Sequence, residues 1–176
     1  CFVIDAPVGI ADFLKGHELK ATYLLLTHQH FDHVEDASAL AESGAEIYGY
    51  SEFDRTLIRD QQAREAWGIP VNVPDFTVNH LLEGKTSLTL GDLTFEVSHV
   101  PGHSPDSISF YLKDELFLFS GDALFAGSIG RTDLPGGSHE QLLDSIRANL
   151  YILPDDVAVF PGHGPDTQIG KEKQSN

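Results

Sequence analysis

The 176-residue sequence contains no methionine and only one cysteine, Cys1. A single cysteine excludes an intramolecular disulfide. No apolar run is long enough for a transmembrane helix, and the first residues, CFVID, carry no basic leader of the secretory kind. We therefore expect a cytoplasmic protein with no membrane partner. Because even an initiator methionine is missing, we expect this chain to be a fragment or a processed product.

Basic residues are also scarce. The chain has 11 Lys and Arg against 27 Asp and Glu, which gives a formal net charge of −16. Binding to nucleic acid requires clustered Lys and Arg, so a nucleic-acid partner is not expected, whereas a small-molecule substrate is. A hydrophobic fraction of 41% in 176 residues is enough for one domain with a substantial core. The composition does not indicate an oligomeric state.

Four short apolar runs share one feature: each is followed at once by side chains that can bind a metal. The first run precedes the segment THQHFDH, from Thr27 to His33, and the others precede PGH, SGD and PGH. An apolar run that ends in glycine is typical of a buried strand reaching the edge of its sheet. We therefore expect four strand ends to converge on one polar site; the runs are Leu24–Leu26, Phe95–Val100, Leu116–Phe119 and Val157–Phe160.

These strand ends supply five histidines and two aspartates, enough for two divalent metals. Histidine nitrogen and aspartate oxygen suit zinc, manganese or iron. Residues two apart in an extended segment point the same way, so one pair of histidines can bind one ion. A shared carboxylate could bridge two ions, which together can hold a hydroxide nucleophile at neutral pH. The seven candidate ligands are His28, His30, Asp32, His33, His103, Asp122 and His163.

The remaining histidines are interpreted as structural. A lone histidine is more often a satisfied surface residue than a metal ligand, so we assign no metal role to His17, His80 and His139. His99 belongs to an alternating strand, which predicts a place nearer the core or behind the ligands.

The pattern of elements predicts an α/β fold with two packed sheets and outer helices. Helices are expected at Ile10–Leu19, at Glu35–Ser43, from Ser51 to about Trp67, and from Ser138 to about Leu150. A loop is expected at Gly68–Asn79, and Gly91 with Asp92 should form a hairpin turn. Strands are expected at Cys1–Asp5, Ala21–Thr27, Glu46–Tyr50, Ser87–Leu90, Leu93–Val100, Ser107–Lys113, Leu116–Phe119 and Val157–Phe160.

The segments THQHFDH, PGHSPDS, SGD and PGHGP resemble the metallo-β-lactamase fold superfamily. The stretch Gly121–Lys173 is similar to its glyoxalase II-like, or hydroxyacylglutathione hydrolase-like, branch of small bacterial hydrolases. The resemblance implies an αββα sandwich of two mixed β-sheets flanked by helices. It also implies one domain over residues 1–176 that lacks its N-terminal strands. The implied ligands are His28, His30, His103 and Asp122 for one ion, and Asp32, His33, His163 and the shared Asp122 for the other.

The resemblance further implies hydrolysis of a thioester by a metal-bridging hydroxide. Zinc is the expected metal, with iron or manganese as alternatives. Asp32 and Asp122 are the expected catalytic residues, Asp32 both as a ligand and as acceptor of the water proton. Arg131 and Asp133 are the expected substrate-binding residues, with Arg131 as the main polar anchor. The family has a tyrosine where this chain has Asp133, and a C-terminal helical extension that this chain lacks, which leaves the thiol carrier open.

The sequence leaves three other functions open. The first is an iron-dependent persulfide dioxygenase, with one iron held by His28, His103 and Asp122. The second is a lactonase or another ester hydrolase on the same metals. The third is a metal-binding module without catalysis, which would not need an open two-metal site. β-Lactam hydrolysis is not expected, because β-lactamases of this superfamily generally have a cysteine at a metal position and Cys1 lies outside every motif.

Overall fold

The computed structural model describes residues 1–58, 65, 68 and 70–176, and it divides into two compact units. The first unit comprises Cys1–Leu82 and the second Glu83–Asn176. The expected single domain over residues 1–176 stays a prediction. Among the helices of the described residues, none has the length and apolar character needed to cross a bilayer.

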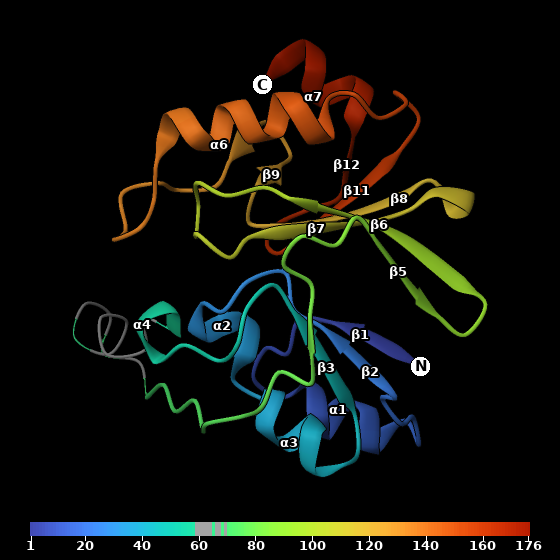
Figure 1. The fold of residues 1–176 in the computed structure, drawn as a ribbon, viewed down its shortest axis with the longest axis vertical. Helices are drawn as coiled ribbons and strands as arrows, with labels where there is room; N and C mark the ends of the chain where they lie inside the picture. Colours follow the sequence, from blue (N-terminus) through green and yellow to red (C-terminus); the bar gives the residue numbers. More distant parts are fainter. Residues whose placement is uncertain (59–64, 66–67, 69) are drawn as a thin grey trace. The chain divides into compact units, whose positions relative to one another are not determined.

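The first unit contains a parallel four-stranded sheet with the order β1-β2-β3-β4. Its helices follow the strands in the alternation that the sequence predicts (Figure 1). Parallel strands need crossover connections, and helices supply these between β1 and β3. The elements are β1 (Phe2–Ile4), α1 (Ile10–Gly16), β2 (Tyr23–Leu25), α2 (Phe31–Val34), α3 (Ala37–Glu42), β3 (Glu46–Gly49), α4 (Arg55–Ile58) and β4 (His80–Leu81).

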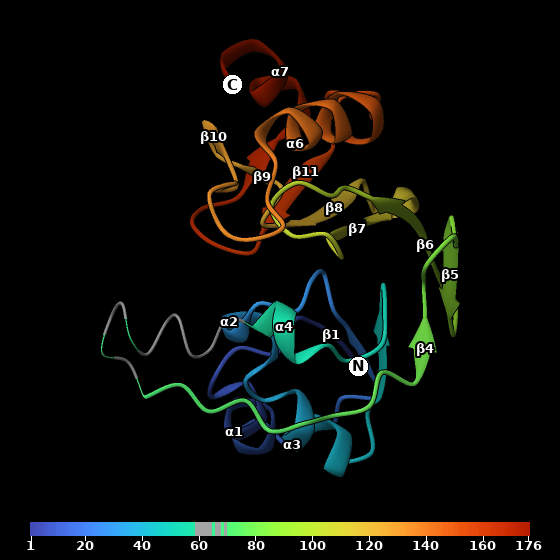
Figure 2. The same ribbon diagram turned by 60° about the vertical axis from the view of Figure 1, so that its left-hand side comes forward.

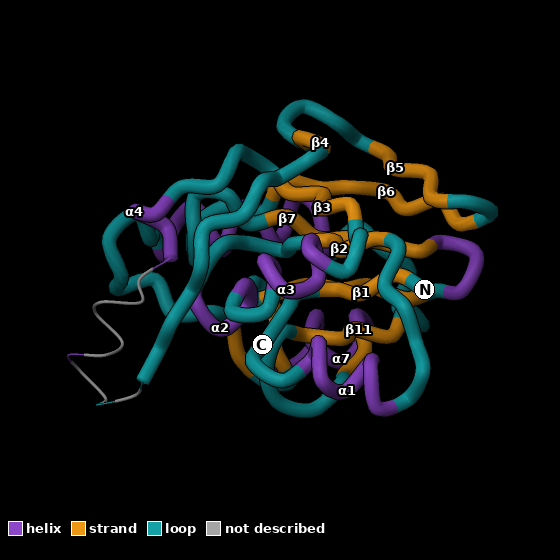
Figure 3. The backbone as a smooth tube through the Cα atoms, turned by 90° about the horizontal axis from the view of Figure 1, so that it is seen from below, coloured by secondary structure: helices purple, strands orange, loops and turns teal. Residues whose placement is uncertain are grey.

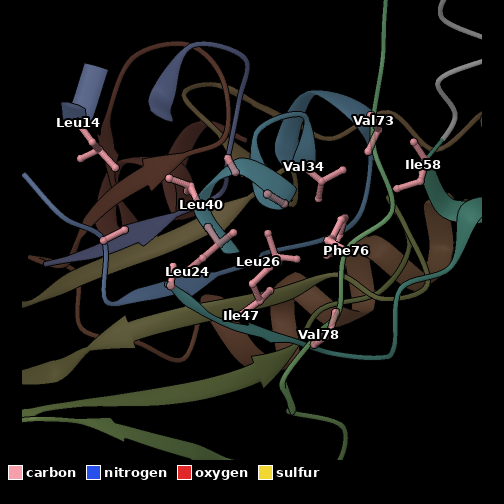
Figure 4. Close-up of a cluster of buried hydrophobic side chains, with 14 of the residues drawn as sticks. Leu14, Leu24, Leu26, Val34, Leu40, Ile47, Ile58, Val73, Phe76 and Val78 are labelled. Carbon is pink, nitrogen blue, oxygen red and sulfur yellow. The ribbon is translucent and has the colours of Figure 1, made fainter. Parts of the chain in front are cut away.

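The core of the first unit forms between its sheet and helices α1 and α3. Figure 4 shows Leu24, Leu26 and Ile47 of the sheet region beside Leu14 of α1 and Leu40 of α3. All five side chains are buried. This packing holds the segment that leaves β2, which contains the first group of candidate ligands.

The helix predicted to begin at Ser51 begins four residues later, with α4. The amide of Gln29 explains the difference: its Nε2 donates to the Glu52 carbonyl and its Oε1 accepts from the Asp54 N–H, each at 2.9 Å. These bonds hold residues 51–54 in a non-helical conformation. The rest of that predicted helix, at 59–64 and 66–67, lies outside the described residues. The described part of the expected loop at 68–79 contains no helix or strand.

The second unit contains a mixed six-stranded sheet with the order β12-β11-β8-β7-β6-β5, and a separate two-stranded hairpin of β9 and β10. The pairing of β8 with β11 is parallel and the others are antiparallel. The predicted turn at Gly91, whose φ is 59°, joins β5 and β6, which lie side by side in Figure 3. The strands are β5 (Ser87–Leu90), β6 (Leu93–His99), β7 (Ile108–Leu112), β8 (Phe117–Gly121), β9 (Leu124–Phe125), β10 (Ser128–Ile129), β11 (Ala158–Pro161) and β12 (Thr167–Gln168).

Helices α6 (His139–Ser145) and α7 (Ile169–Ser175) belong to the same unit (Figure 1). The hydroxyl of Ser138 accepts from the Gln141 N–H at 3.3 Å and so caps α6, at the start that the sequence predicts. Leu142 packs with the sheet residues Leu118 and Val159 in one buried cluster. The cluster fixes α6 on the sheet, beside the loop that follows β6.

Candidate metal centre

The seven predicted ligands fall into two groups, one in each unit. In the first unit, His28 and His30 lie in the extended segment after β2, and α2 then begins at Phe31 and presents Asp32 and His33. The three histidines are buried, and Asp32 is half-buried. An apolar parallel strand therefore ends in a tight cluster of metal-capable side chains.

The imidazoles of His28 and His30 point toward each other. His28 Nε2 lies 3.0 Å from His30 Nδ1, and the two ring centroids are 4.6 Å apart. The His28 ring also lies 4.1 Å from that of His33. Three imidazoles, two of them close to His28, form a donor set suited to divalent metals.

A buried carboxylate that the sequence does not single out, Asp5, supports two of these rings, one directly and one through a hydroxyl. Asp5 Oδ2 accepts from His33 Nδ1 at 2.8 Å and from the Thr27 hydroxyl at 2.8 Å. That hydroxyl lies 3.1 Å from His28 Nδ1 and can accept its proton. Binding of Nδ1 to an acceptor orients the ring and leaves Nε2 for a metal.

Asp5 is itself held firmly. It is 7% exposed, its Oδ1 accepts from the Thr27 N–H at 2.7 Å, and its φ of 58° is unusual for a residue other than glycine. The sequence signal is present but weak: a single aspartate directly after an apolar strand. The sequence predicts Asp5 as the last residue of that strand, whereas β1 ends at Ile4.

In the second unit, His103, Asp122 and His163 each follow a different strand: β6, β8 and β11. His103 Nε2 lies 3.5 Å from Asp122 Oδ2, and His163 Nε2 lies 3.6 Å from the same oxygen. Two ligands of one tetrahedral zinc are about 3.3 Å apart, given zinc–ligand distances of about 2.0–2.1 Å. The spacing therefore fits one carboxylate oxygen that shares an ion with each histidine.

The polypeptide after Asp122 packs closely against these ligands. The carbonyl of Arg131 accepts from His103 Nδ1 at 2.8 Å, which leaves Nε2 on the side of Asp122. A Cβ atom at Gly130 would lie 1.8 Å from the Asp122 carbonyl oxygen, so only glycine fits. The ring of Phe125 has its centroid 6.5 Å from that of His163.

Helix α6 supports the loop that contains His103. The Ser138 N–H donates to the Gly102 carbonyl at 2.8 Å, and the Ser145 hydroxyl donates to the Pro101 carbonyl at 3.0 Å. A Cβ atom at Gly102 would lie 2.4 Å from the backbone nitrogen of Leu142. The loop therefore lies directly on the helix backbone, and this contact fixes the residue that follows it.

The predicted substrate residues form an exposed ion pair. Arg131 donates from Nε and Nη2 to the two carboxylate oxygens of Asp133, each at 2.8 Å. The hydrogen bonds from Arg131 lower the pKa of Asp133 to about 2, and the same bonds raise the pKa of Arg131. Any anionic group that binds Arg131 therefore competes with Asp133.

The expectation for His99 is wrong. Its side chain is exposed, and Nε2 lies 2.8 Å from the Pro105 carbonyl, because the ring turns toward the loop after β6. Of the histidines given no metal role, His17 bonds the Phe13 carbonyl and His80 lies 3.2 Å from a Glu46 oxygen.

Imidazole and carboxylate donors in both groups fit a divalent metal on chemical grounds. In the second unit the spacing of the donors agrees with that chemistry. The same donors suit zinc, iron and manganese, so the donor set alone does not choose among these metals.

Solved structures with a similar fold include metalloproteins. A structure described as the BLEG-1 B3 metallo-beta-lactamase is 38% identical, with a TM-score of 0.86, and the match covers 98% of this chain and 85% of that one. TTHA1623, described in a di-iron-bound form, is 36% identical with a TM-score of 0.82 over 98% and 86%. ETHE1 from Myxococcus xanthus is 30% identical with a TM-score of 0.78 over 99% and 72%.

Curated relatives agree with these structures. The hydroxyacylglutathione hydrolase GloC of Haemophilus influenzae is 42% identical over 99% of this chain and 84% of its own length. The probable metallo-hydrolase YqgX of Bacillus subtilis is 36% identical over 100% of this chain and 85% of its own length. The family described as the metallo-beta-lactamase superfamily matches residues 9–163. The chain thus belongs to the metallo-β-lactamase superfamily and has its α/β fold, with sheets flanked by helices, as its ligand motifs predicted.

Proposed function

We propose that this member of a metal-dependent hydrolase superfamily is a glyoxalase II-like thioester hydrolase. The observation that carries the proposal is the relative named hydroxyacylglutathione hydrolase, at 42% identity over 99% of the chain. The two ligand groups support it, because in each group imidazole nitrogens lie close to other metal-capable donors: His28 Nε2 is near His30 Nδ1, and the Nε2 atoms of His103 and His163 are near Asp122 Oδ2. The proposal includes one centre of two ions built from both groups, with Asp122 as the shared ligand.

In this proposal the protein positions its reactants before any bond changes. Bound metals would supply an activated water and stabilise the developing oxyanion. Asp32 is the proposed acceptor of the water proton, since it follows the first two ligands and is half-buried. The leaving thiolate needs no dedicated acid, because thiols ionise near pH ~8.5. Zinc is the proposed metal.

Arg131 is the proposed anchor for a carboxylate on the substrate. Its carbonyl bonds His103, so its guanidinium starts from a fixed point beside a ligand. A substrate carboxylate would replace Asp133 on the guanidinium. The negative charge of Asp133 would then disfavour highly anionic substrates relative to singly charged ones. Smaller thioesters are then expected to be better substrates than glutathione thioesters.

Metal content and thioester turnover test the proposal together. The purified chain is loaded with zinc, its metal content is measured by mass spectrometry, and thiol release is followed with a chromogenic reagent. Glutathione and non-glutathione thioesters are compared at equal concentration. We expect two zinc ions per chain and turnover that a chelator abolishes. Full metal content without hydrolysis of any thioester would refute the thioesterase and leave the metal site intact.

A second candidate is oxygen-dependent chemistry on iron, as in a persulfide dioxygenase. The observation that favours iron is the neighbour in a di-iron-bound form, at 36% identity. Iron-loaded protein is assayed for oxygen uptake with a persulfide. Uptake with one iron per chain, and no thiol release from thioesters, would replace the first proposal.

The neighbour named as a B3 metallo-beta-lactamase, at 38% identity, makes a chromogenic β-lactam a necessary third substrate. The position of Cys1 outside the ligand motifs argues against β-lactam hydrolysis, but the similarity to this neighbour argues for testing it. Turnover of the β-lactam above that of every thioester would assign the chain to that reaction.

A further inference from the structure

Glu172 in α7 is a fully buried carboxylate outside the ligand set. Its Oε2 accepts from the Gly127 N–H at 2.8 Å, and its Oε1 accepts from the Thr167 hydroxyl. A carboxylate that is buried away from water is stable only when hydrogen-bond donors of the protein replace its lost hydration. One of these donors lies in its own neighbourhood, but the other lies 45 residues away along the chain.

The distant donor, Gly127, lies in the turn between strands β9 and β10. Its φ of 71° is accessible to glycine at little cost. A second bond from the C-terminus holds the same turn: Asn176 Nδ2 donates to the Ser128 carbonyl at 2.8 Å. Two side chains from the α7 region therefore tether the tip of this hairpin, whose strands and α7 are labelled in Figure 2.

Residues of the hairpin and of its far end lie beside all three candidate ligands of the second unit. Gly130 packs against the Asp122 backbone, the Arg131 carbonyl bonds His103, and the Phe125 ring lies beside His163. A shift of the hairpin would therefore disturb Asp122 and His103 directly, and it would change the packing of Phe125 near His163. A ligand set on three separate strand ends needs one common support, and the hairpin is placed to provide it.

We propose that Glu172 is a positioning residue for the metal ligands of the second unit. By binding the Gly127 amide, it fixes the β9–β10 hairpin and through it the spacing of Nε2 and Oδ2 donors around Asp122. The inference rests on the proposed metal-dependent function, because positioning matters only if these donors bind metal.

Two substitutions of similar size separate hydrogen bonding from volume. Glu172→Gln can keep both bonds, with its oxygen accepting from Gly127 and its amide donating to the Thr167 hydroxyl. Glu172→Leu fills similar space and has no acceptor, so the Gly127 N–H loses its partner. Glu140→Leu, at an exposed position of α6, is the matched control for removing an acidic side chain.

Zinc affinity is measured on the full chain by competition with a chromogenic chelator, and cobalt absorption spectra report ligand geometry. We expect Glu172→Leu to weaken zinc binding at least tenfold and to alter the cobalt spectrum. The loss expected for the Leu variant agrees with the roughly 10–100-fold loss that is usual when a supporting partner of a ligand is removed. The zinc affinity of Glu172→Gln should stay within about threefold of the wild type. In metal-free protein, the Gly127 amide should exchange at least tenfold faster in the Leu variant.

Each outcome decides the proposal. If the Leu variant folds and keeps wild-type affinity and spectrum, Glu172 only stabilises the fold and the proposal is wrong. If the Leu variant does not fold, Thr167→Val decides, since it removes one anchor of the carboxylate and should weaken zinc binding several-fold. Wild-type affinity in that variant would overturn the proposal. If the wild type itself binds no zinc, the proposed metal-dependent function fails first and the inference falls with it.

Discussion

The two ligand groups are held in opposite ways. The four candidate ligands of the first unit lie within six consecutive residues, and a single carboxylate, Asp5, orients two of the imidazoles directly or through Thr27. The three candidate ligands of the second unit follow three different strands and lie up to 60 residues apart in sequence, and close backbone packing at Gly102 and Gly130 helps to fix them. The first group depends on side-chain hydrogen bonds to one carboxylate, whereas the second combines hydrogen bonds to backbone carbonyls with two close contacts that only glycine permits. Substitutions should therefore damage the two groups by different physical routes.

The largest effect is expected at Gly130. Gly130→Ala places a methyl group 1.8 Å from the Asp122 carbonyl, so the backbone must move and carry Asp122 with it. We expect activity to fall by more than ~100-fold, because misplacement of about 1 Å can cost that much. Gly16→Ala is the control, since nothing lies within 4 Å of the position that its methyl group would take. Wild-type turnover and zinc content in Gly130→Ala would show that the close packing has no role.

The second largest effect is expected from substitution of Asp5. Asp5→Asn cannot accept from all three of its present donors, so His33 or Thr27 loses a partner. We expect zinc affinity to fall about 10- to 100-fold, as is usual when a supporting carboxylate is lost. Asp12→Asn, an exposed substitution in α1, should bind zinc as the wild type does. Unchanged affinity in Asp5→Asn would mean that the Nδ1 bonds do not orient these rings for a metal.

Substitution of Arg131 should weaken substrate binding without changing the metal content. Since a charge-assisted hydrogen bond contributes about 1.5–3 kcal/mol, Arg131→Ala should raise KM roughly tenfold to a hundredfold for a carboxylate-bearing thioester. Its backbone carbonyl still bonds His103, so metal content should not change. Arg147→Ala removes an exposed arginine of a similar environment and serves as the control. An unaltered KM for every thioester tried would move the search to the described part of the 68–79 loop.

The smallest effect concerns the pH dependence of stability at Asp133. Its pKa is lowered in the folded chain to about 2 from an ordinary 3.8, by hydrogen bonds from Arg131. A depressed pKa contributes stability above the unfolded value, and this is lost as pH falls through the folded value. The melting temperatures of wild type and Asp133→Asn should therefore differ by a constant amount from pH 5 to 9, and converge near pH 2. A difference that varies between pH 5 and 9 would contradict this assignment.

The same contrast explains what the sequence could predict. The first group was recognisable because three histidines and an aspartate within six residues are improbable by chance, and the strand before them is strongly apolar. Asp5 was missed because one aspartate after a strand is common, and its role depends on a contact with His33, 28 residues away.

Long-range contacts also explain the errors in the elements. The predicted start of α4 was wrong because the side-chain oxygen of Gln29, 25 residues earlier, accepts a hydrogen bond from the Asp54 N–H. His99 was misplaced because alternation along β6 ignores the loop carbonyl that its ring reaches. Local patterns correctly predicted the start of α1, the Ser138 cap and the hairpin at Gly91, where the determining residues are neighbours in sequence, but α1 ends at Gly16, three residues before the predicted end.

The parallel pairing of β8 with β11 has a consequence for how the chain is made. Residues 158–161 must return to pair with residues 117–121, so this contact closes a long loop and forms late in folding. During synthesis the N-terminus leaves the ribosome first, so residues 158–161 emerge after residues 117–121. Of the seven candidate ligands, His163, which follows β11, is therefore the last to reach its place, and a nascent chain cannot assemble the candidate set until residues 158–163 have been made.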